Sequence, residues 1–212
     1  MDIKPKALGY HVAGVTQGFS LDTSQLPPCA ALDAATIVRY LLGSTMLKRD
    51  HPFPRRARLS SFDYRGPHAY FLTINARDRC PVFVEGSICA MVRRALVEGA
   101  TRFSFQVHAY CFMPDHLHLL VAGTREDSDL RRFLRHFKQA TGYAYKRAYG
   151  HRLWAYSYYD HVLRREEGVQ NIASYLLANP VRGGLVQRYE DYPYSACHML
   201  GKHFQDAAQA AQ

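Results

Sequence analysis

The histidines at positions 116 and 118 have the clearest chemical potential in this chain. They lie in the stretch AYCFMPDHLHLLVAG, after a Pro114-Asp115 pair that is typical of a tight turn. A strand over residues 116–122 alternates its side chains between two faces, so His116 and His118 point the same way, with Cα atoms roughly 6–7 Å apart. Two imidazoles at this spacing can bind one metal ion, although histidines on a solvated strand face have the same pattern.

Tyr175 and Asn179 form a second pair, in a predicted helix that starts near residue 166 and ends at Asn179-Pro180. Residues four apart lie one turn from each other on the same helix face. A metal held by two histidines needs a third ligand and open positions for substrate, and an asparagine carbonyl suits this role. A tyrosine beside a metal-bound phosphate can attack phosphorus and form a phosphotyrosine. The four residues therefore permit metal-assisted phosphodiester cleavage.

Hydrophobic periodicity predicts the elements that position these residues. Strands are predicted over 69–77, 103–112, 116–122 and 152–163, and helices over 86–100, 127–149 and 166–179. The turn at 113–115 joins the second and third strands into a hairpin. The order β-α-β-β-α-β-α predicts an α+β domain, an antiparallel sheet with helices packed on it.

The strand predicted over 103–112 alternates strictly between apolar and polar residues. Because strand side chains alternate between faces, we expect one face to carry Phe103, Phe105, Val107, Ala109 and Cys111. The other face is then expected to carry Ser104, Gln106, His108 and Tyr110.

The composition favours a polyanionic partner. The chain has 27 lysine and arginine residues against 18 aspartate and glutamate residues, a formal net charge of +9, which favours nucleic acid over a membrane surface. The five cysteines form no CxxC pair, which favours reduced thiols. There is no signal-peptide pattern, and no apolar run approaches the roughly 18 residues of a membrane span. We therefore expect a cytoplasmic protein with no membrane partner.

The helix predicted over 127–149 has a strongly basic face. Such faces are usually only solvated, but here the face coincides with the positive net charge and with nearby tyrosine and histidine side chains, a mixture that suits single-stranded nucleic acid. His161 is a further candidate for a DNA contact, although a hydrogen-bonded structural histidine fits equally well. The candidate DNA-binding residues are Arg131, Arg132, Arg135, Lys138, Lys146, Arg147 and His161.

Several motifs resemble the single-tyrosine HUH transposases (the IS200-like superfamily), and within them the REP-associated tyrosine transposases. The run YCFMPDHLHLLV is similar to their histidine strand, and IASYLLANPVRGGLV to their tyrosine helix. LWAYSYYDHVLRREE resembles their tryptophan-containing strand, and PYSACHML their closing segment. The resemblance covers about residues 58–200. Two departures are the long N-terminal extension and YDH where that branch more often has WEH.

The resemblance implies a ferredoxin-like HUH nuclease core. It implies that His116 and His118 are metal ligands, that Tyr175 is the nucleophile, and that Asn179 is the third ligand, where relatives often have glutamine. The implied cofactor is a divalent ion, Mg²⁺ or Mn²⁺, and the implied partner is single-stranded or hairpin DNA. The products would be a 5′-phosphotyrosine link and a free 3′-OH. A monomer and a homodimer are both compatible with the sequence.

Two classes of function fit these motifs. The first is a transposase, a DNA strand transferase acting on hairpin or palindromic DNA such as a REP element; the second is a domesticated hairpin-binding protein without cleavage activity. The intact HUH motif, Tyr175 and Asn179 favour the enzyme. Tyr143 and Tyr145 are the nearest rival nucleophiles, but no NPV sequence follows them. A relaxase-like or replication-initiator nuclease is disfavoured, because those are generally larger and carry other motif orders.

The chain is expected to divide into three parts. Residues 1–56 show no sustained periodicity, apart from an amphipathic helix predicted over 32–47, and are interpreted as a partly disordered N-terminal extension. Residues 57–202 form the single catalytic domain, and residues 203–212 a flexible tail. For a transposase of this type, we expect a bacterial cytoplasmic protein associated with the nucleoid.

Overall fold

A computed structural model describes residues 62–164 and 167–203 of the protein. The helix predicted over 32–47 and the boundary predicted at residue 57 lie outside the described residues, as does the tail from residue 204. Within the described part of the chain, no helix combines the length and the hydropathy that a membrane span requires.

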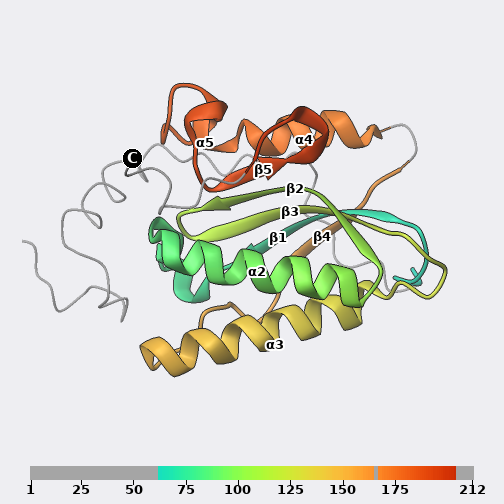
Figure 1. The fold of residues 1–212 in the computed structure, drawn as a ribbon, viewed down its shortest axis with the longest axis horizontal. Coiled ribbons are helices and arrows are strands. Elements are labelled where there is room, and N and C mark those ends of the chain that lie inside the picture. Colours follow the sequence, from blue (N-terminus) through green and yellow to red (C-terminus); the bar gives the residue numbers. More distant parts are fainter. Residues whose placement is uncertain (1–61, 165–166, 204–212) are drawn as a thin grey trace, which may run out of the picture.

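The described residues form one antiparallel sheet with helices on both faces (Figure 1). The strands are β1 (Ala69–Asn75), β2 (Phe105–Met113), β3 (His116–Gly123), β4 (Tyr159–Val162) and β5 (Ser195–Cys197), in the order β4-β1-β3-β2-β5. The helices are α2 (Gly86–Arg102), α3 (Leu130–Tyr149), α4 (Val169–Leu177) and α5 (Asn179–Arg182). Short 3-10 helices are η2 (Arg77–Arg79), η3 (Val82–Val84), η5 (Tyr189–Asp191) and η6 (His198–Leu200). The α+β class predicted from the sequence is confirmed.

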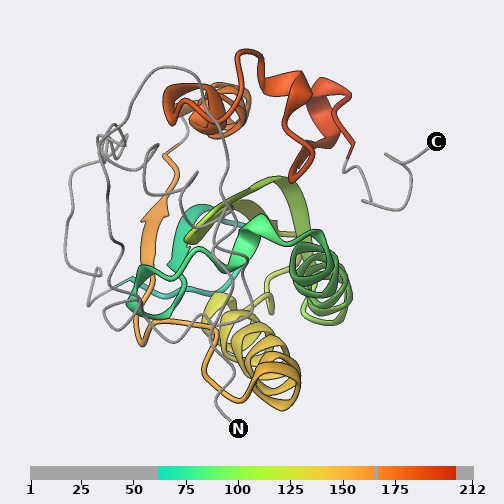
Figure 2. The ribbon, with the colours of Figure 1, turned by 90° about the vertical axis from the view of Figure 1, so that its left-hand side faces the viewer.

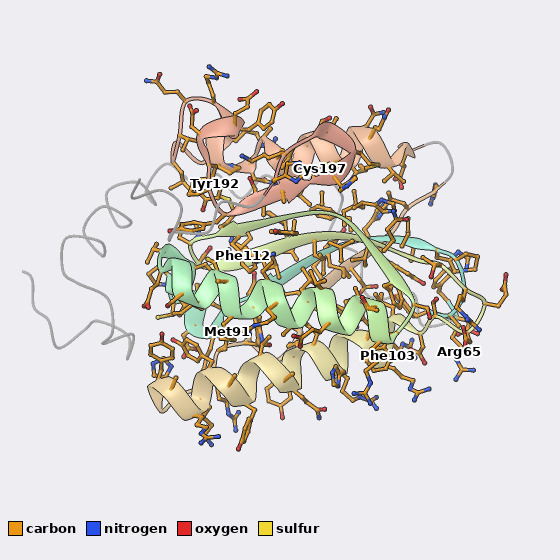
Figure 3. All side chains as sticks on the ribbon, viewed as in Figure 1. Arg65, Met91, Phe103, Phe112, Tyr192 and Cys197 are labelled. Carbon is orange, nitrogen blue, oxygen red and sulfur yellow. The ribbon has the colours of Figure 1, made fainter. Side chains whose placement is uncertain are left out.

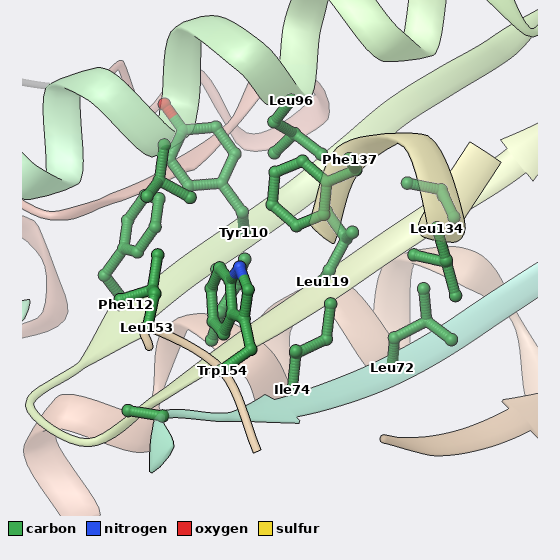
Figure 4. Close-up of a cluster of buried hydrophobic side chains, with 14 of the residues drawn as sticks. Leu72, Ile74, Leu96, Tyr110, Phe112, Leu119, Leu134, Phe137, Leu153 and Trp154 are labelled. Atoms are coloured by element: carbon green, nitrogen blue, oxygen red, sulfur yellow. The ribbon is translucent and has the colours of Figure 1, made fainter. Parts of the chain in front are cut away.

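The two faces of the sheet are covered by different helices. Two views at right angles place α2 and α3 on one face and α4 and α5 on the other (Figures 1 and 2). On the α2–α3 face, Leu72, Ile74 and Leu119 pack against Leu134 and Phe137 of α3 (Figure 4). This apolar burial, worth about 25 cal/mol per Å², holds the helices on the sheet.

A second buried cluster lies under α4. Phe71 of β1 and Leu120 of β3 belong to it, together with Ile172 and Leu176 of α4. Leu72 and Leu119, their neighbours in sequence, belong to the cluster on the other face, as the alternation of strand side chains requires. The side chains of β1 and β3 therefore divide between an α3 face and an α4 face.

A β-bulge in β2 divides between the two faces of the sheet the side chains that were predicted to share one face. The pairing of β2 with β3 shifts between Val107 and Ala109, and the extra residue reverses the alternation that follows it. Phe105 belongs to the cluster on the α3 face, whereas Ala109 and Cys111 belong to the cluster on the α4 face. The expectation that these side chains share one face is therefore wrong.

Only part of the segment predicted as a strand over 152–163 pairs with the sheet. Strand β4 begins at Tyr159, while Trp154 forms an isolated bridge with Ala76. The indole Nε1 of Trp154 donates a hydrogen bond of 2.8 Å to Thr141 Oγ1 of α3. Burial of this indole against α3 holds the segment 152–158 beside the helix, where it bonds only to the end of β1 among the described strands (Figure 4).

Strand β5 extends the sheet at its β2 edge and was not predicted. It pairs with β2 from Ala109 to Cys111. Tyr192, which precedes it, lies on the α4 side of the sheet near Cys197 (Figure 3), and its hydroxyl donates a hydrogen bond of 2.6 Å to Phe112 O. This contact fixes the chain just before the strand begins.

The described cysteines fall into two groups. Cys89, Cys111 and Cys197 are buried free thiols, as expected. Cys80 is disulfide-bonded, so the expectation of reduced thiols is wrong for this residue. Spacing along the sequence cannot show such a bond, because disulfide formation depends on which sulfur lies within reach in space.

Candidate active site

The imidazoles of His116 and His118 meet on the α4 face of the sheet. Their Nε2 atoms are 3.0 Å apart. The His118 ring stacks on Phe71, a member of the cluster under α4, with ring centroids 5.4 Å apart. The alternation of β3 therefore brings the two rings together as the sequence pattern predicts, on the same face as the helix that carries Tyr175.

Each histidine is held through its Nδ1 atom. His118 Nδ1 lies 3.0 Å from Thr73 Oγ1 of β1, the strand beside β3. His116 Nδ1 lies 2.5 Å from a carboxylate oxygen of Asp115, whose other oxygen lies 3.1 Å from Arg79 Nε. A carboxylate and a hydroxyl can both accept an Nδ1–H hydrogen bond, which is the arrangement that leaves Nε2 available to a metal.

The histidine pair fits two adjacent ligands of a divalent ion. Metal–nitrogen bonds of about 2.1 Å at a right angle place two ligand nitrogens about 3.0 Å apart, and the separation of the two Nε2 atoms is 3.0 Å. Within residues 62–164 and 167–203, no group of three or more histidine, cysteine, aspartate or glutamate side chains could hold a metal. An amide carbonyl, water or a substrate phosphate can complete the ligand set of a divalent ion.

Tyr175 lies on α4, half-buried, on the same side of the sheet as the histidines. Its ring meets the edge of Phe71, with centroids 6.5 Å apart, and Phe71 in turn stacks on His118. Phe71 thus connects the tyrosine to the histidine pair through ring contacts. Sequence reasoning did not single out Phe71, because its role depends on contacts between three separate elements.

The two rival tyrosines lie on α3, which covers the opposite face of the sheet. Tyr145 is buried, and this burial, together with the charge of Tyr149, raises the pKa of its phenol to about 12. Tyr143 is 70% exposed. Neither lies on the face where His116 and His118 meet, whereas Tyr175 does.

Asn179 contacts α4 and α5 rather than the histidines. Helix α4 ends at Leu177 and α5 begins at Asn179, so the prediction of one helix through both Tyr175 and Asn179 is wrong. The Nδ2 of Asn179 donates to Leu176 O at 2.9 Å, and its Oδ1 accepts a hydrogen bond of 2.7 Å from Arg182. One lone pair of Oδ1 is therefore engaged, and the second is the one that a metal could use.

Arg182 joins Tyr175 to Asn179. Its guanidinium carbon lies 3.8 Å from the centroid of the Tyr175 ring, and Nη2 also donates to Tyr175 O at 3.1 Å. Sequence reasoning missed this residue, as it missed Thr73 and Asp115. The only signal for Arg182 was its place in the NPVR run, three residues after Asn179.

His161 lies on β4 directly opposite Phe71, so it faces the same side of the sheet as the candidate site. Its Nε2 is 2.9 and 3.0 Å from the two carboxylate oxygens of Glu167. Burial alone would raise the pKa of Glu167, but hydrogen bonds from the Arg164 amide and from His161 outweigh it and lower the pKa. The histidine is thus held by a charged partner.

The other candidate DNA-binding residues do not lie at the histidine pair. All six are on α3, across the sheet from α4 (Figure 2). Their positions separate the predicted basic surface from the predicted chemistry. The residues are Arg131, Arg132, Arg135, Lys138, Lys146 and Arg147.

A sequence model of the family described as "Transposase IS200 like" matches residues 67–179, more than half of the chain. The protein belongs to the IS200-like transposase family. The matched stretch contains both histidines, Tyr175 and Asn179, and ends before Arg182. The family resemblance stated from the motifs is confirmed.

Two curated relatives of this chain are named as REP-associated tyrosine transposases. The chain is 25% identical over 133 residues to the REP-associated tyrosine transposase of Escherichia coli K12, covering 61% of this chain and 76% of the relative. It is 26% identical over 147 residues to a Haemophilus influenzae protein provisionally named as the same type of transposase, covering 64% and 83%.

A solved structure shares the fold of this IS200-like transposase. It is the structure of a REP-associated tyrosine transposase bound to a REP hairpin, with a TM-score of 0.57 and 22% sequence identity. The match covers 71% of this chain and 90% of that one. The similarity supports the sheet and helix arrangement described above.

Proposed function

We propose that this IS200-like transposase is a metal-dependent endonuclease and strand transferase for single-stranded DNA. Its substrate would be hairpin or palindromic DNA, and its intermediate a 5′-phosphotyrosine on Tyr175. The family match over 67–179 lies within residues 57–202, the unit that we propose as the catalytic domain. Two relatives named as REP-associated tyrosine transposases, and a solved structure of such a transposase bound to a REP hairpin, support the hairpin substrate.

The observation that carries this proposal is the arrangement on the α4 face. The Nε2 atoms of His116 and His118 lie at the separation that one ion requires, with each Nδ1 held by a partner. Tyr175 lies on the same face, connected to His118 through Phe71. Histidines that bind a metal through one ring nitrogen usually donate a hydrogen bond from the other to a carboxylate or another acceptor, and a carboxylate and a hydroxyl provide such acceptors here.

When bound, Mg²⁺ or Mn²⁺ would polarise the phosphoryl oxygen and offset the charge of the transition state. His116 and His118 would hold the ion through Nε2, and the carbonyl oxygen of Asn179 would be the third ligand. Arg182, which donates to that oxygen, would keep the amide in one orientation. We also propose that His161, held by Glu167 on the same face, contacts the DNA near the cleaved bond.

The chemical step belongs to Tyr175. Its phenol gives its proton to solvent, the resulting phenolate oxygen attacks phosphorus, and the bond between phosphorus and the 3′-oxygen breaks. The 3′-oxygen takes up a proton and leaves as a free 3′-OH, while the 5′-phosphate remains as an ester of the tyrosine. Attack by a 3′-OH on this ester reverses the step and joins DNA strands.

A cleavage assay tests the proposal. The full-length chain is incubated with Mn²⁺ and a labelled hairpin oligonucleotide that carries single-stranded flanks, and the products are separated on a denaturing gel. We expect a covalent protein–DNA band that requires the metal and is absent from Tyr175→Phe and His118→Ala. Tyr145→Phe is the matched control, since Tyr145 lies on the opposite side of the sheet, and it should form the band.

The outcomes separate the two functions that the motifs allow. A hairpin that binds wild-type protein without forming the covalent band would contradict cleavage and favour the domesticated binding protein. A band that persists in Tyr175→Phe would contradict the assignment of the nucleophile. Loss of the band in Tyr145→Phe would point to Tyr145 in its place.

A further inference from the structure

A large groove lies between α3 and the segment 152–158, on the face of the sheet opposite to the histidine pair. Its volume is about 920 Å³. Five of the residues that line it are basic, and none is acidic, so the groove suits a polyanion. The basic residues are Arg131, Arg135, Lys138, Lys146 and Arg152.

Three of these cations are available to a ligand. Arg135, Lys146 and Arg152 are exposed, and none of them forms an ion pair with a carboxylate of the described residues. Lys138 has a structural role, because its ammonium donates to Ala155 O at 2.9 Å and to Tyr156 O at 3.1 Å. It therefore ties the segment that forms the other wall of the groove to α3.

Two exposed tyrosines border the same groove. Tyr143 is 70% exposed and Tyr156 is 96% exposed. Aromatic rings left in water beside cations are the arrangement with which proteins bind single strands, since bases stack on the rings while phosphates contact the cations. Paired bases inside a duplex cannot stack on a protein ring in this way, so the groove favours an unpaired strand.

Ala155, which lines the groove, lies at the end of the sheet where His116 begins β3. Ala155 N donates a hydrogen bond of 3.0 Å to Asn75 O at the end of β1, and Asn75 is paired with His116. The wall of the groove and the first histidine are therefore separated by one strand. A DNA strand in the groove would therefore reach the α4 face by passing this end of the sheet.

We propose that this groove binds the single-stranded DNA that flanks the cleaved bond, as a second contact surface separate from the site of chemistry. Phosphates would contact Arg135, Lys146 and Arg152, and bases would stack on Tyr156 and Tyr143. The inference rests on the proposed function, because it assigns the flanking strand of the same substrate. It assigns the duplex part of a hairpin to some other surface.

The test measures binding of the full-length chain by fluorescence anisotropy. The probes are a hairpin with a single-stranded tail, the same hairpin without a tail, and an oligothymidine with no secondary structure. We expect Tyr156→Ala to weaken binding of the tailed hairpin and of oligothymidine roughly 5- to 100-fold, the effect of losing one stacked base. Tyr156→Phe keeps the ring and should restore the affinity.

The basic residues are tested through salt dependence. Arg135→Ala should reduce the slope of log affinity against log salt concentration by about 0.7, the value for one phosphate contact of a single strand. The matched control is Arg94→Ala, an exposed arginine on α2 that does not line the groove, and its slope should equal that of wild type. A merely solvated basic face would give equal slopes for both variants.

Three results would overturn the groove proposal. The first is equal affinity of Tyr156→Ala and wild type for the tailed hairpin. The second is a salt slope of Arg135→Ala that equals that of wild type. The third is a loss of affinity in Tyr156→Ala that is as large for the hairpin without a tail as for the tailed hairpin. Failure of the proposed function would look different. Wild-type protein would then form no covalent adduct, while Tyr156→Ala would still weaken binding of the tailed probe.

Discussion

The guanidinium carbon of Arg182 lies 3.8 Å from the centroid of the Tyr175 ring. The same guanidinium donates hydrogen bonds to Tyr175 O and to Asn179 Oδ1. Because α4 ends at Leu177 and α5 begins at Asn179, Tyr175 and Asn179 are on separate helices. Arg182 therefore fixes the position of one relative to the other.

Replacing Arg182 should slow the chemical step more than it weakens DNA binding. We expect Arg182→Ala to lower the rate of adduct formation at saturating DNA by about 10- to 100-fold, since small misplacements of a reacting group have costs of this size. Arg182→Lys should recover little of the rate, because lysine lacks the planar group that stacks and donates twice. Single-turnover kinetics measure this rate.

Arg188→Ala is the matched control for Arg182, since Arg188 is exposed and its ion pair within the described part of the chain is with Glu190. It should form adduct at the wild-type rate. A reduced affinity of Arg182→Ala with an unchanged single-turnover rate would contradict the positioning role.

The residues that hold the Nδ1 atoms should control metal affinity. Thr73→Val removes the hydroxyl beside His118, and Asp115→Asn removes the charge beside His116. Each should weaken Mn²⁺ binding, measured by calorimetry on the DNA-free protein, by roughly 10- to 100-fold. Thr141→Val, which removes a buried hydroxyl on the other face of the sheet, should cost stability and leave Mn²⁺ affinity unchanged. A wild-type Mn²⁺ affinity in both Thr73→Val and Asp115→Asn would contradict the metal site.

The Glu167–His161 pair should make folding stability depend on acid pH. Hydrogen bonds from Arg164 N and His161 outweigh the effect of burial and hold the pKa of Glu167 below its usual 4.5. As pH falls below this value, the unfolded chain binds the proton first, so the contribution of Glu167 to stability is present above it and declines below it. Glu167→Gln should therefore melt below wild type at pH 6, and the difference should shrink as pH falls below 4.5. A difference independent of pH would contradict this.

Alanine substitutions at two glycines should change the free energy of unfolding in opposite directions. A Cβ at Gly123 would lie 2.2 Å from Gly66 O and 2.9 Å from Ser128 Cβ, so Gly123→Ala should lower the free energy of unfolding by about 1–3 kcal/mol. A Cβ at Gly142 in α3 would meet nothing closer than 3.9 Å, so Gly142→Ala should raise it by about 0.5–1 kcal/mol. Urea denaturation measures both, and the same sign for both would contradict the packing described here.

The parts of the fold that depend on local patterns could be predicted from the sequence. The turn at Pro114-Asp115 and the alternation after it predicted that His116 and His118 share a face, and they do. The four-residue spacing placed Tyr175 and Asn179 near each other, although they lie on two helices rather than one. Periodicities of 2 and 3.6 residues are sufficient for such predictions, because each involves one element.

Features that depend on contacts between elements were not predicted. Strict alternation through 103–112 concealed the bulge between Val107 and Ala109, since one inserted residue leaves the apolar pattern unchanged while reversing the faces. Thr73 and Asp115 act on the histidines from a neighbouring strand and from the turn, and their residue types alone are unremarkable. The basic residues of α3 were found, but their place across the sheet from the histidines required the topology.

The most direct test of the central claim is to identify the residue that becomes linked to DNA. Wild-type protein is trapped with Mn²⁺ and a hairpin oligonucleotide, digested with protease and nuclease, and analysed by tandem mass spectrometry. The account predicts a 5′-phosphonucleotide on Tyr175, in the peptide that contains NIASYLLANPVR. A nucleotide on Tyr143, Tyr145 or any other residue would contradict it.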